Sequence, residues 1–215
     1  MIRISAFAWV QPFAQGYVRD LRLRWALEEA GIPYEVRRVD RAARASAEYR
    51  ALQPFGQVPS YEEDGLVLFE SGAIVLHIAE RSEALLPAEA GARARAITWL
   101  FAALNTVEPP IVEREAFMLL ERDKGWYDQR LAMLDANVRS VLGELSRFLG
   151  DRIWLEDEFT AGDLMMVAVL RRLEDGPNLV AEYPNLFAYV ARGEARPAFA
   201  RAFRAQAAVF ERSNA

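Results

Sequence analysis

The sequence predicts an α/β domain followed by an all-helical domain. Strand and helix patterns alternate over residues 1–82, whereas beyond residue 92 the patterns are helical. Residues 83–92 have the composition of a linker. Because this change of pattern along a chain is typical of separate layers of structure, we expect an α/β domain over 1–82 and a helical domain over 93–215.

The first half has the predicted order βαβ, helix, ββα. Apolar residues alternate over residues 2–6, as in a strand with one buried face. From about Tyr17 they recur at helical spacing, until Gly31 and Pro33 end the helix. The further elements expected in this half are a strand at 34–39, a short helix at 46–52, strands at 59–61 and 66–69 joined by an Asp-Gly turn, and a helix at 71–81.

The second half shows helical patterns only. Thr160 and Asp163 precede an apolar run in the spacing of a capping box, and we expect a structural role for them, worth about 1 kcal/mol per cap. The helices expected in this half lie at 93–105, 111–124, 126–149, 162–173, 184–192 and 197 to about 208.

Composition excludes several classes of function. The 215 residues include no cysteine, which predicts a reducing compartment such as the cytoplasm and excludes a mechanism that uses a thiol of the protein. With the single His77, the chain offers no metal site. The net charge of −5 argues against nucleic acid as a partner. We find no signal peptide, and no apolar segment long enough to span a membrane.

Four stretches of the sequence resemble the cytosolic glutathione transferase family. They read RWALEEAGIPYE at 24–35, ALQPFGQVP at 51–59, LFESGAI at 68–74, and FTAGD at 159–163 with YPNL and ARPAF behind it. Their order and spacing cover nearly the whole chain. The resemblance implies a thioredoxin-like N-terminal domain that binds glutathione, a helical-bundle C-terminal domain that supplies the second-substrate pocket, and a homodimer.

The resemblance also implies that the Val58–Pro59 bond is cis. The N–H and C=O of Val58 would then face outward and pair with the cysteinyl backbone of glutathione like an added strand. Gln57 would contact the same peptide. Arg44 lies where relatives carry a basic residue for the glycyl carboxylate; the alternative is an ordinary solvated arginine.

Glu70 and Ser71 stand at the predicted start of a helix. Ser71 is a plausible cap, and the free N–H groups of a first helical turn form an anion site. The carboxylate of the γ-glutamyl group suits this helix start, and Glu70 suits the ammonium group. The alternative is a plain capped helix with a solvated glutamate.

The resemblance implies that Tyr17 is the activating residue, because it stands at the position equivalent to the family's serine. The thiol of glutathione resembles that of cysteine, with a pKa near 8.5, so lowering it by about two units requires roughly 2.7 kcal/mol of preferential stabilisation of the thiolate. A hydroxyl group at a helix start could provide this. The alternatives are that Tyr17 only packs, or that Trp9, Gln11 or Gln15 on the preceding loop is the donor.

An apolar second-substrate pocket is expected as well. Trp9 and Phe13 are candidates on the loop before the first helix, and Trp99 on the first helix of the second half; aromatic residues at helical spacing also commonly belong to the core. Asn105 and Glu108, at the expected end of that helix, could face the cleft.

The resemblance implies a transferase that joins the glutathione thiolate to a small hydrophobic electrophile. One alternative is a glutathione-dependent isomerase or peroxidase, although the Ser-Ser-Cys run of the isomerase branch is absent. Branches that use a cysteine are excluded. The other alternative is a glutathione-binding, regulatory or scaffold protein of the same fold without catalysis, which the unusual first loop keeps open.

Overall fold

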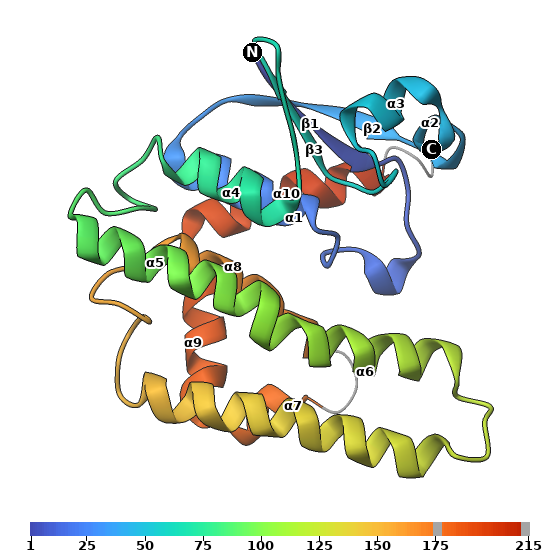
Figure 1. The fold of residues 1–215 in the computed structure, drawn as a ribbon, viewed down its shortest axis with the longest axis vertical. Coiled ribbons are helices and arrows are strands. Elements are labelled where there is room, and N and C mark those ends of the chain that lie inside the picture. The colour runs from blue at the N-terminus through green and yellow to red at the C-terminus, as the bar shows by residue number, and fades with distance from the viewer. Residues whose placement is uncertain (174–177, 212–215) are drawn as a thin grey trace. The chain divides into compact units, whose positions relative to one another are not determined.

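The computed structural model describes residues 1–173 and 178–211 (Figure 1). The chain forms two compact units, one of Met1–Ala88 with Ala195–Ala215 and the other of Glu89–Glu194. The first is an α/β unit and the second is helical, so the predicted fold class is confirmed. Among the described residues, strands occur only in the first 69 positions.

The α/β unit is built on one four-stranded sheet with the order β2-β1-β3-β4. Strand β1 pairs in parallel with β2 and antiparallel with β3, and β3 pairs antiparallel with β4. The strands are β1 (Ile2–Phe7), β2 (Tyr34–Val39), β3 (Ser60–Glu63) and β4 (Leu66–Phe69). All four occur where the sequence predicts them, to within two residues.

Helices pack on this sheet, and their ends follow local signals. Helix α1 ends at Gly31, which has a φ of 66° and is therefore in the left-handed conformation that favours glycine. Asp40 and Ser46 cap two consecutive short helices where one was predicted. The helical segments of this unit are η1 (Pro12–Ala14), α1 (Asp20–Ala30), α2 (Arg41–Ala45), α3 (Ala47–Leu52), α4 (Ser71–Ala79) and α10 (Pro197–Glu211).

Helix α10 packs against α1. The rings of Trp25 and Phe199 meet edge to face with centroids 5.0 Å apart. Buried Asp20 accepts hydrogen bonds from Arg24 Nε and from Gln206 Nε2, each at 2.7 Å, and its pKa is raised by burial against the opposing effect of Arg24. The break between the units falls inside the predicted linker, but α10, which the sequence analysis placed in the helical domain, belongs to the α/β unit.

The helical unit contains a long, nearly continuous helical run. Where the sequence analysis expected a break between residues 105 and 111, helix α5 leads through the π-helical turn η2 directly into α6, which begins at Glu108. Pro109 and Pro110 lie in the first turn of α6, where a helix tolerates proline best. The segments of this unit are α5 (Ala90–Ala102), η2 (Ala103–Val107), α6 (Glu108–Leu120), α7 (Tyr127–Leu149), α8 (Ala161–Leu170), η3 (Arg171–Leu173), η4 (Leu179–Glu182) and α9 (Pro184–Glu194).

Helix α8 begins with the predicted capping box. Thr160 Oγ1 accepts from the N–H of Gly162 at 3.1 Å, and Asp163 Oδ2 accepts from the N–H of Thr160 at 2.9 Å. Asp163 Oδ1 also accepts from the N–H of Leu155 and from the hydroxyl of Tyr189, both at 2.9 Å. Burial raises the pKa of Asp163 although these donors lower it. Asp163 therefore holds three segments together, which is more than a cap requires.

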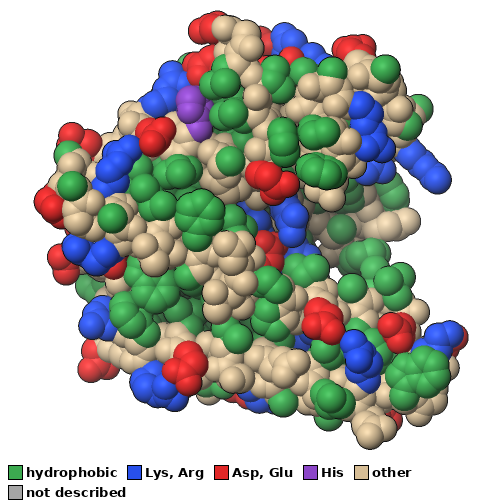
Figure 2. Space-filling model, viewed as in Figure 1, with side chains coloured by type: hydrophobic (Ala, Val, Ile, Leu, Met, Phe, Trp, Pro, Cys, Tyr) green, Lys and Arg blue, Asp and Glu red, His purple; other side chains and the backbone are tan. Residues whose placement is uncertain are grey.

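The surface carries mixed charge. Figure 2 shows basic and acidic side chains interspersed on the viewed face, without a broad basic area. Within residues 1–173 and 178–211, no helix combines the length and apolarity needed to cross a bilayer.

Candidate functional site

The β3–β4 hairpin brings the two central motifs of the sequence to one end. Val58–Pro59 comes just before β3, and Glu70–Ser71 comes just after β4. Since Ser60 pairs with Phe69 in an antiparallel register, the residues that flank this pair emerge side by side. Strand β1 is antiparallel to β3, so the loop that follows Phe7 starts from the same end of the sheet.

Val58 presents a free backbone edge at this end. The Val58–Pro59 peptide bond is cis, as the resemblance implies. The Val58 side chain is buried in a cluster with Val39 and Tyr49, against which Phe7 packs. Within the part of the chain that the structure describes, the N–H and C=O of Val58 have no hydrogen-bond partner. They form a donor–acceptor pair that an extended peptide could use.

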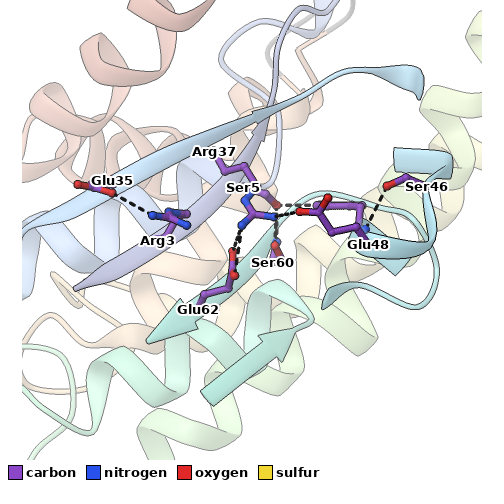
Figure 3. A network of polar contacts seen from close by, with 9 residues as sticks. Arg3, Ser5, Glu35, Arg37, Ser46, Glu48, Ser60 and Glu62 are labelled. Carbon is purple, nitrogen blue, oxygen red and sulfur yellow. Dashed lines mark hydrogen bonds and ion pairs between the residues drawn. The ribbon is translucent and has the colours of Figure 1, made fainter. Parts of the chain in front are cut away.

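The backbone before Val58 is tightly held. The N–H of Gln57 donates to Gln53 Oε1 at 3.2 Å, and its C=O accepts from the hydroxyl of Tyr49 at 2.7 Å. Gln57 itself is exposed. Ser5 and Ser60, which lie next to each other in Figure 3, continue this polar network into the sheet.

Arg44 lies on the same cluster. Its guanidinium carbon stands 5.0 Å from the centroid of the Phe7 ring, in cation–π geometry. Its Nε is buried without a hydrogen-bond partner. Arg44 is thus linked to the cluster of Val58 through Phe7, which packs against that cluster.

The start of α4 differs from the expectation. Ser71 is the first residue of the helix and not its cap; the capping position belongs to Glu70, whose side chain makes no capping hydrogen bond. Glu70 is exposed and has a φ of 69°, an uncommon backbone conformation for any residue but glycine. Among the described residues, no side chain caps the N–H groups of the first turn, which makes this helix start a potential anion site.

Arg22 is a residue of this region that the sequence analysis missed. From the buried face of α1, its Nη1 donates to the Oγ of Ser71 at 3.2 Å. The signal in the sequence is a pair of arginines inside an otherwise apolar run, LRLRWAL, because a helix buries such residues only with partners. Which partner Arg22 finds depends on how α1 packs on α4, and the sequence does not give that.

The loop before α1 places Tyr17 outside the helix. Helix α1 begins at Asp20, so Tyr17 lies in the preceding turn, half-buried, with its N–H bonded to the C=O of Ala14 at 3.1 Å. The predicted helix start at Tyr17 was therefore three residues too early. Trp9 and Phe13 are exposed on this loop, by 44% and 60%, and Gln15 Nε2 donates to the C=O of Val10 at 3.3 Å.

Three predicted pocket residues lie in the helical unit. Trp99 packs on Phe148 with ring centroids 4.5 Å apart, and its Nε1 donates to Glu156 at 3.1 Å. Asn105 is exposed in η2, and Glu108 is buried at the start of α6. Trp99 thus already serves the packing of its own unit.

A pocket of about 820 Å³ lies elsewhere in the α/β unit, between α1, β2 and α10. Arg24, Tyr34 and Ala205 are among its lining residues, and none of the predicted site residues is. Burial is the main cause that raises the pKa of Tyr34 there. Among the described residues, no group of histidines and carboxylates is arranged to hold a metal ion.

Comparison with known proteins identifies the family. Residues 14–80 match the glutathione S-transferase N-terminal domain, and residues 114–192 match the glutathione S-transferase C-terminal domain. Glutathione S-transferase 3 of Zea mays is 32% identical over 195 residues, which cover 83% of this chain and 86% of the maize protein. The disulfide-bond oxidoreductase YfcG of Escherichia coli is 32% identical over 100 residues, 42% of this chain and 46% of that protein.

A solved structure agrees over nearly the full length. A glutathione transferase family member from Pseudomonas fluorescens, crystallised with two glutathione bound, is 27% identical, with a TM-score of 0.81 and coverage of 94% of this chain and 92% of that one. Both family domains match, and the similarity to the maize protein covers most of both chains. This chain belongs to the glutathione S-transferase family.

Proposed function

We propose that this protein binds glutathione at the end of the β3–β4 hairpin and transfers its thiolate to a small hydrophobic electrophile. One observation carries the proposal: the register that pairs Ser60 with Phe69 sets the free backbone edge of Val58 beside the uncapped start of α4. A tripeptide needs both, because one part of it is an extended backbone and the other is a terminal carboxylate. The Pseudomonas relative, whose structure has glutathione bound, supports this ligand.

The γ-glutamyl group is assigned to Glu70 and Ser71. Its carboxylate would lie against the N–H groups of the first turn of α4 and accept a hydrogen bond from Ser71. Its ammonium group would pair with the carboxylate of Glu70, which is exposed and uses no capping bond. Both charged ends of one amino acid would thus be bound by adjacent residues.

The remaining two residues of glutathione are assigned to the opposite strand of the hairpin. The cysteinyl N–H and C=O would pair with the C=O and N–H of Val58, with Pro59 holding the turn. The glycyl carboxylate would pair with the guanidinium group of Arg44, which lies over the Phe7 ring, and Gln57 would contact the same end.

Thiolate formation is assigned to Tyr17. A phenol hydroxyl that donates to the sulfur favours S⁻ over SH, and this lowers the pKa of the thiol. Trp9 and Phe13, exposed and apolar on the same loop, are proposed for the electrophile. Trp99, Asn105 and Glu108 stay predictions for the helical unit. Conjugation of this kind fits a role in detoxification in the cytoplasm.

The test separates binding from activation. We expect the protein to be retained on immobilised glutathione, and bound glutathione to show the ultraviolet band of a thiolate near pH 7. Tyr17→Phe should keep the retention, lose most of the band and lower the conjugation rate about 100-fold, the usual size for one stabilising donor. Tyr183→Phe is the matched control, because it removes a tyrosine hydroxyl that donates to the C=O of Arg139 in the helical unit. An unchanged rate in Tyr17→Phe would mean that another group donates the hydrogen bond to the glutathione sulfur.

A second candidate is thiol–disulfide exchange, which the Escherichia coli relative favours by its name. The chain has no cysteine, so two glutathione molecules would have to supply both thiols. The thiolate of the first glutathione would attack the disulfide substrate, form a mixed disulfide and release one thiol. The thiolate of the second would attack the glutathione sulfur of this mixed disulfide, release the other thiol and form oxidised glutathione. Reduction of a small disulfide without conjugation would support this candidate. Retention on glutathione without a thiolate band or either activity would support a non-catalytic binding protein.

We also propose a homodimer. Phe55 is 63% exposed and meets the partly exposed Phe69 edge to face, with centroids 6.0 Å apart. Such a projecting aromatic pair is unusual on a surface that faces only water. A sedimentation mass near 24 kDa at micromolar concentration would contradict the dimer.

A further inference from the structure

We infer that Tyr49 is a positioning residue for the ligand, acting through Val58, and that Ser5 and Ser60 fix its hydroxyl. The inference rests on the proposed function, because it concerns the same backbone edge. Tyr49 contacts the buried side of this segment and not the proposed ligand. Its ring packs on the Val58 side chain, and its hydroxyl donates to the C=O of Gln57 at 2.7 Å.

The four groups form one continuous chain of hydrogen bonds. Ser5 Oγ lies 2.8 Å from the hydroxyl of Tyr49. The same Oγ accepts from the N–H of Ser60 at 2.7 Å and from the Oγ of Ser60 at 3.0 Å. Figure 3 shows Ser5 of β1 beside Ser60 at the start of β3. All three side chains are buried, so water does not compete for these bonds.

The number of available protons allows only one donor-to-acceptor direction for this series of hydrogen bonds. The C=O of Gln57 can only accept, so Tyr49 must donate its one proton to it. Tyr49 can then only accept from Ser5, and Ser5 in turn accepts both groups of Ser60. Each hydroxyl therefore has a fixed role, from Ser60 through Ser5 and Tyr49 to the carbonyl of Gln57.

The last bond sets the direction of the ligand-binding N–H. The C=O of Gln57 and the N–H of Val58 belong to the same peptide plane, and in a trans peptide they point in opposite directions. The cis bond of this segment is the next one, Val58–Pro59. When Tyr49 draws the carbonyl of Gln57 inward, the N–H of Val58 must point outward. The N–H of Ser60, held by Ser5, fixes the chain on the other side of the turn.

Tyr49→Phe tests this inference because it keeps the ring and removes only the hydroxyl. We expect the affinity for glutathione to fall about tenfold, the loss of roughly one hydrogen bond. For γ-glutamylcysteamine, which keeps the thiol and the γ-glutamyl group but lacks the cysteinyl carbonyl, the affinity should change less than about twofold. The two ligands separate an effect on the N–H of Val58 from a general loss of structure.

Tyr61→Phe is the matched control. Tyr61 is also buried in the α/β unit, but its hydroxyl donates to Glu63 at 2.6 Å and has no bond to residue 57. It should leave both affinities unchanged. If Tyr49→Phe does not fold, Ser60→Ala, which removes only the first hydroxyl of the chain, replaces it with an expected threefold weakening for glutathione alone.

The outcomes are distinct. If the wild-type protein binds glutathione and Tyr49→Phe binds it equally well, or weakens both ligands by the same factor, the positioning role is overturned while the proposed function stands. If the wild-type protein does not bind glutathione, the proposed function itself fails.

Discussion

Helices α8 and α4 both have a hydroxyl residue at their start, and the two starts are built in opposite ways. At α8, Thr160 and Asp163 satisfy the backbone on both sides of the cap and are fully buried. At α4, no side chain caps the helix, Ser71 faces Arg22, and Glu70 adopts a positive φ. At α8 the protein's own side chains bind the backbone N–H groups of the helix start. At α4 the N–H groups of the first turn stay available to a ligand.

The difference separates stability from function. A completed cap lowers the free energy of the folded state and has nothing left to offer a ligand. An uncapped start with a strained residue costs folding free energy, and such a cost persists where the surrounding structure and a binding role maintain it. The sequence patterns of the two starts look alike, but their chemistry differs because of what packs around them.

The largest expected effect is on the α8 side. Asp163→Ala should lower the free energy of unfolding by about 3 kcal/mol, because it leaves the N–H groups of Leu155 and Thr160 and the hydroxyl of Tyr189 without their acceptor in a buried site. Urea unfolding measures this. Asp157→Ala, an exposed neighbour, is the control. Glutathione affinity of the folded variant should stay within twofold, and a larger loss would contradict the separation.

The next effect is on the α4 side. Ser71→Ala should weaken glutathione binding about tenfold, because the ligand carboxylate loses one charge-assisted hydrogen bond. Thr160→Ala is the matched variant at the other helix: it should lose about 1 kcal/mol of stability and no affinity. Calorimetric titration and urea unfolding of both proteins check this. Equal losses of affinity in the two variants would break the comparison.

The smallest effect concerns backbone strain. Glu70→Gly should raise the free energy of unfolding by about 1 kcal/mol, since glycine accepts a φ of 69° without a steric cost, although its freedom in the unfolded chain opposes part of this gain. It should also weaken glutathione binding through the lost carboxylate. Glu70→Gln separates the two, because it should reduce affinity with little change in stability. A loss of stability in Glu70→Gly would mean that the side chain itself supports the fold.

Local patterns predicted local structure well. The strand at 34–39, the Asp-Gly hairpin and the capping box depend on neighbours within a few residues, and the structure has all three. The start of α1 at Asp20 was missed because apolar spacing does not distinguish a helix from the turn before it. The contact between Arg22 and Ser71 spans 49 residues, and no local signal carries it.

The site could be predicted in part for the same reason. The resemblance implied the cis bond, which the structure has, and the hairpin register explains why Val58 and Glu70, a dozen residues apart, come together. The roles of Tyr17, Arg44 and the pocket residues stay predictions, because they depend on where a ligand lies.

The discontinuity of the α/β unit has a consequence for how the protein is made. Its core is incomplete until α10 has been synthesised, because Trp25 needs Phe199 and Asp20 needs Gln206. The helical unit, continuous from Glu89 to Glu194, is synthesised before α10. A chain that stops at residue 194 would lack the side chains of α10 that contact Asp20 and Trp25. Folding of the α/β unit thus depends on helix α10, so a chain truncated before Pro197 should lose stability in that unit.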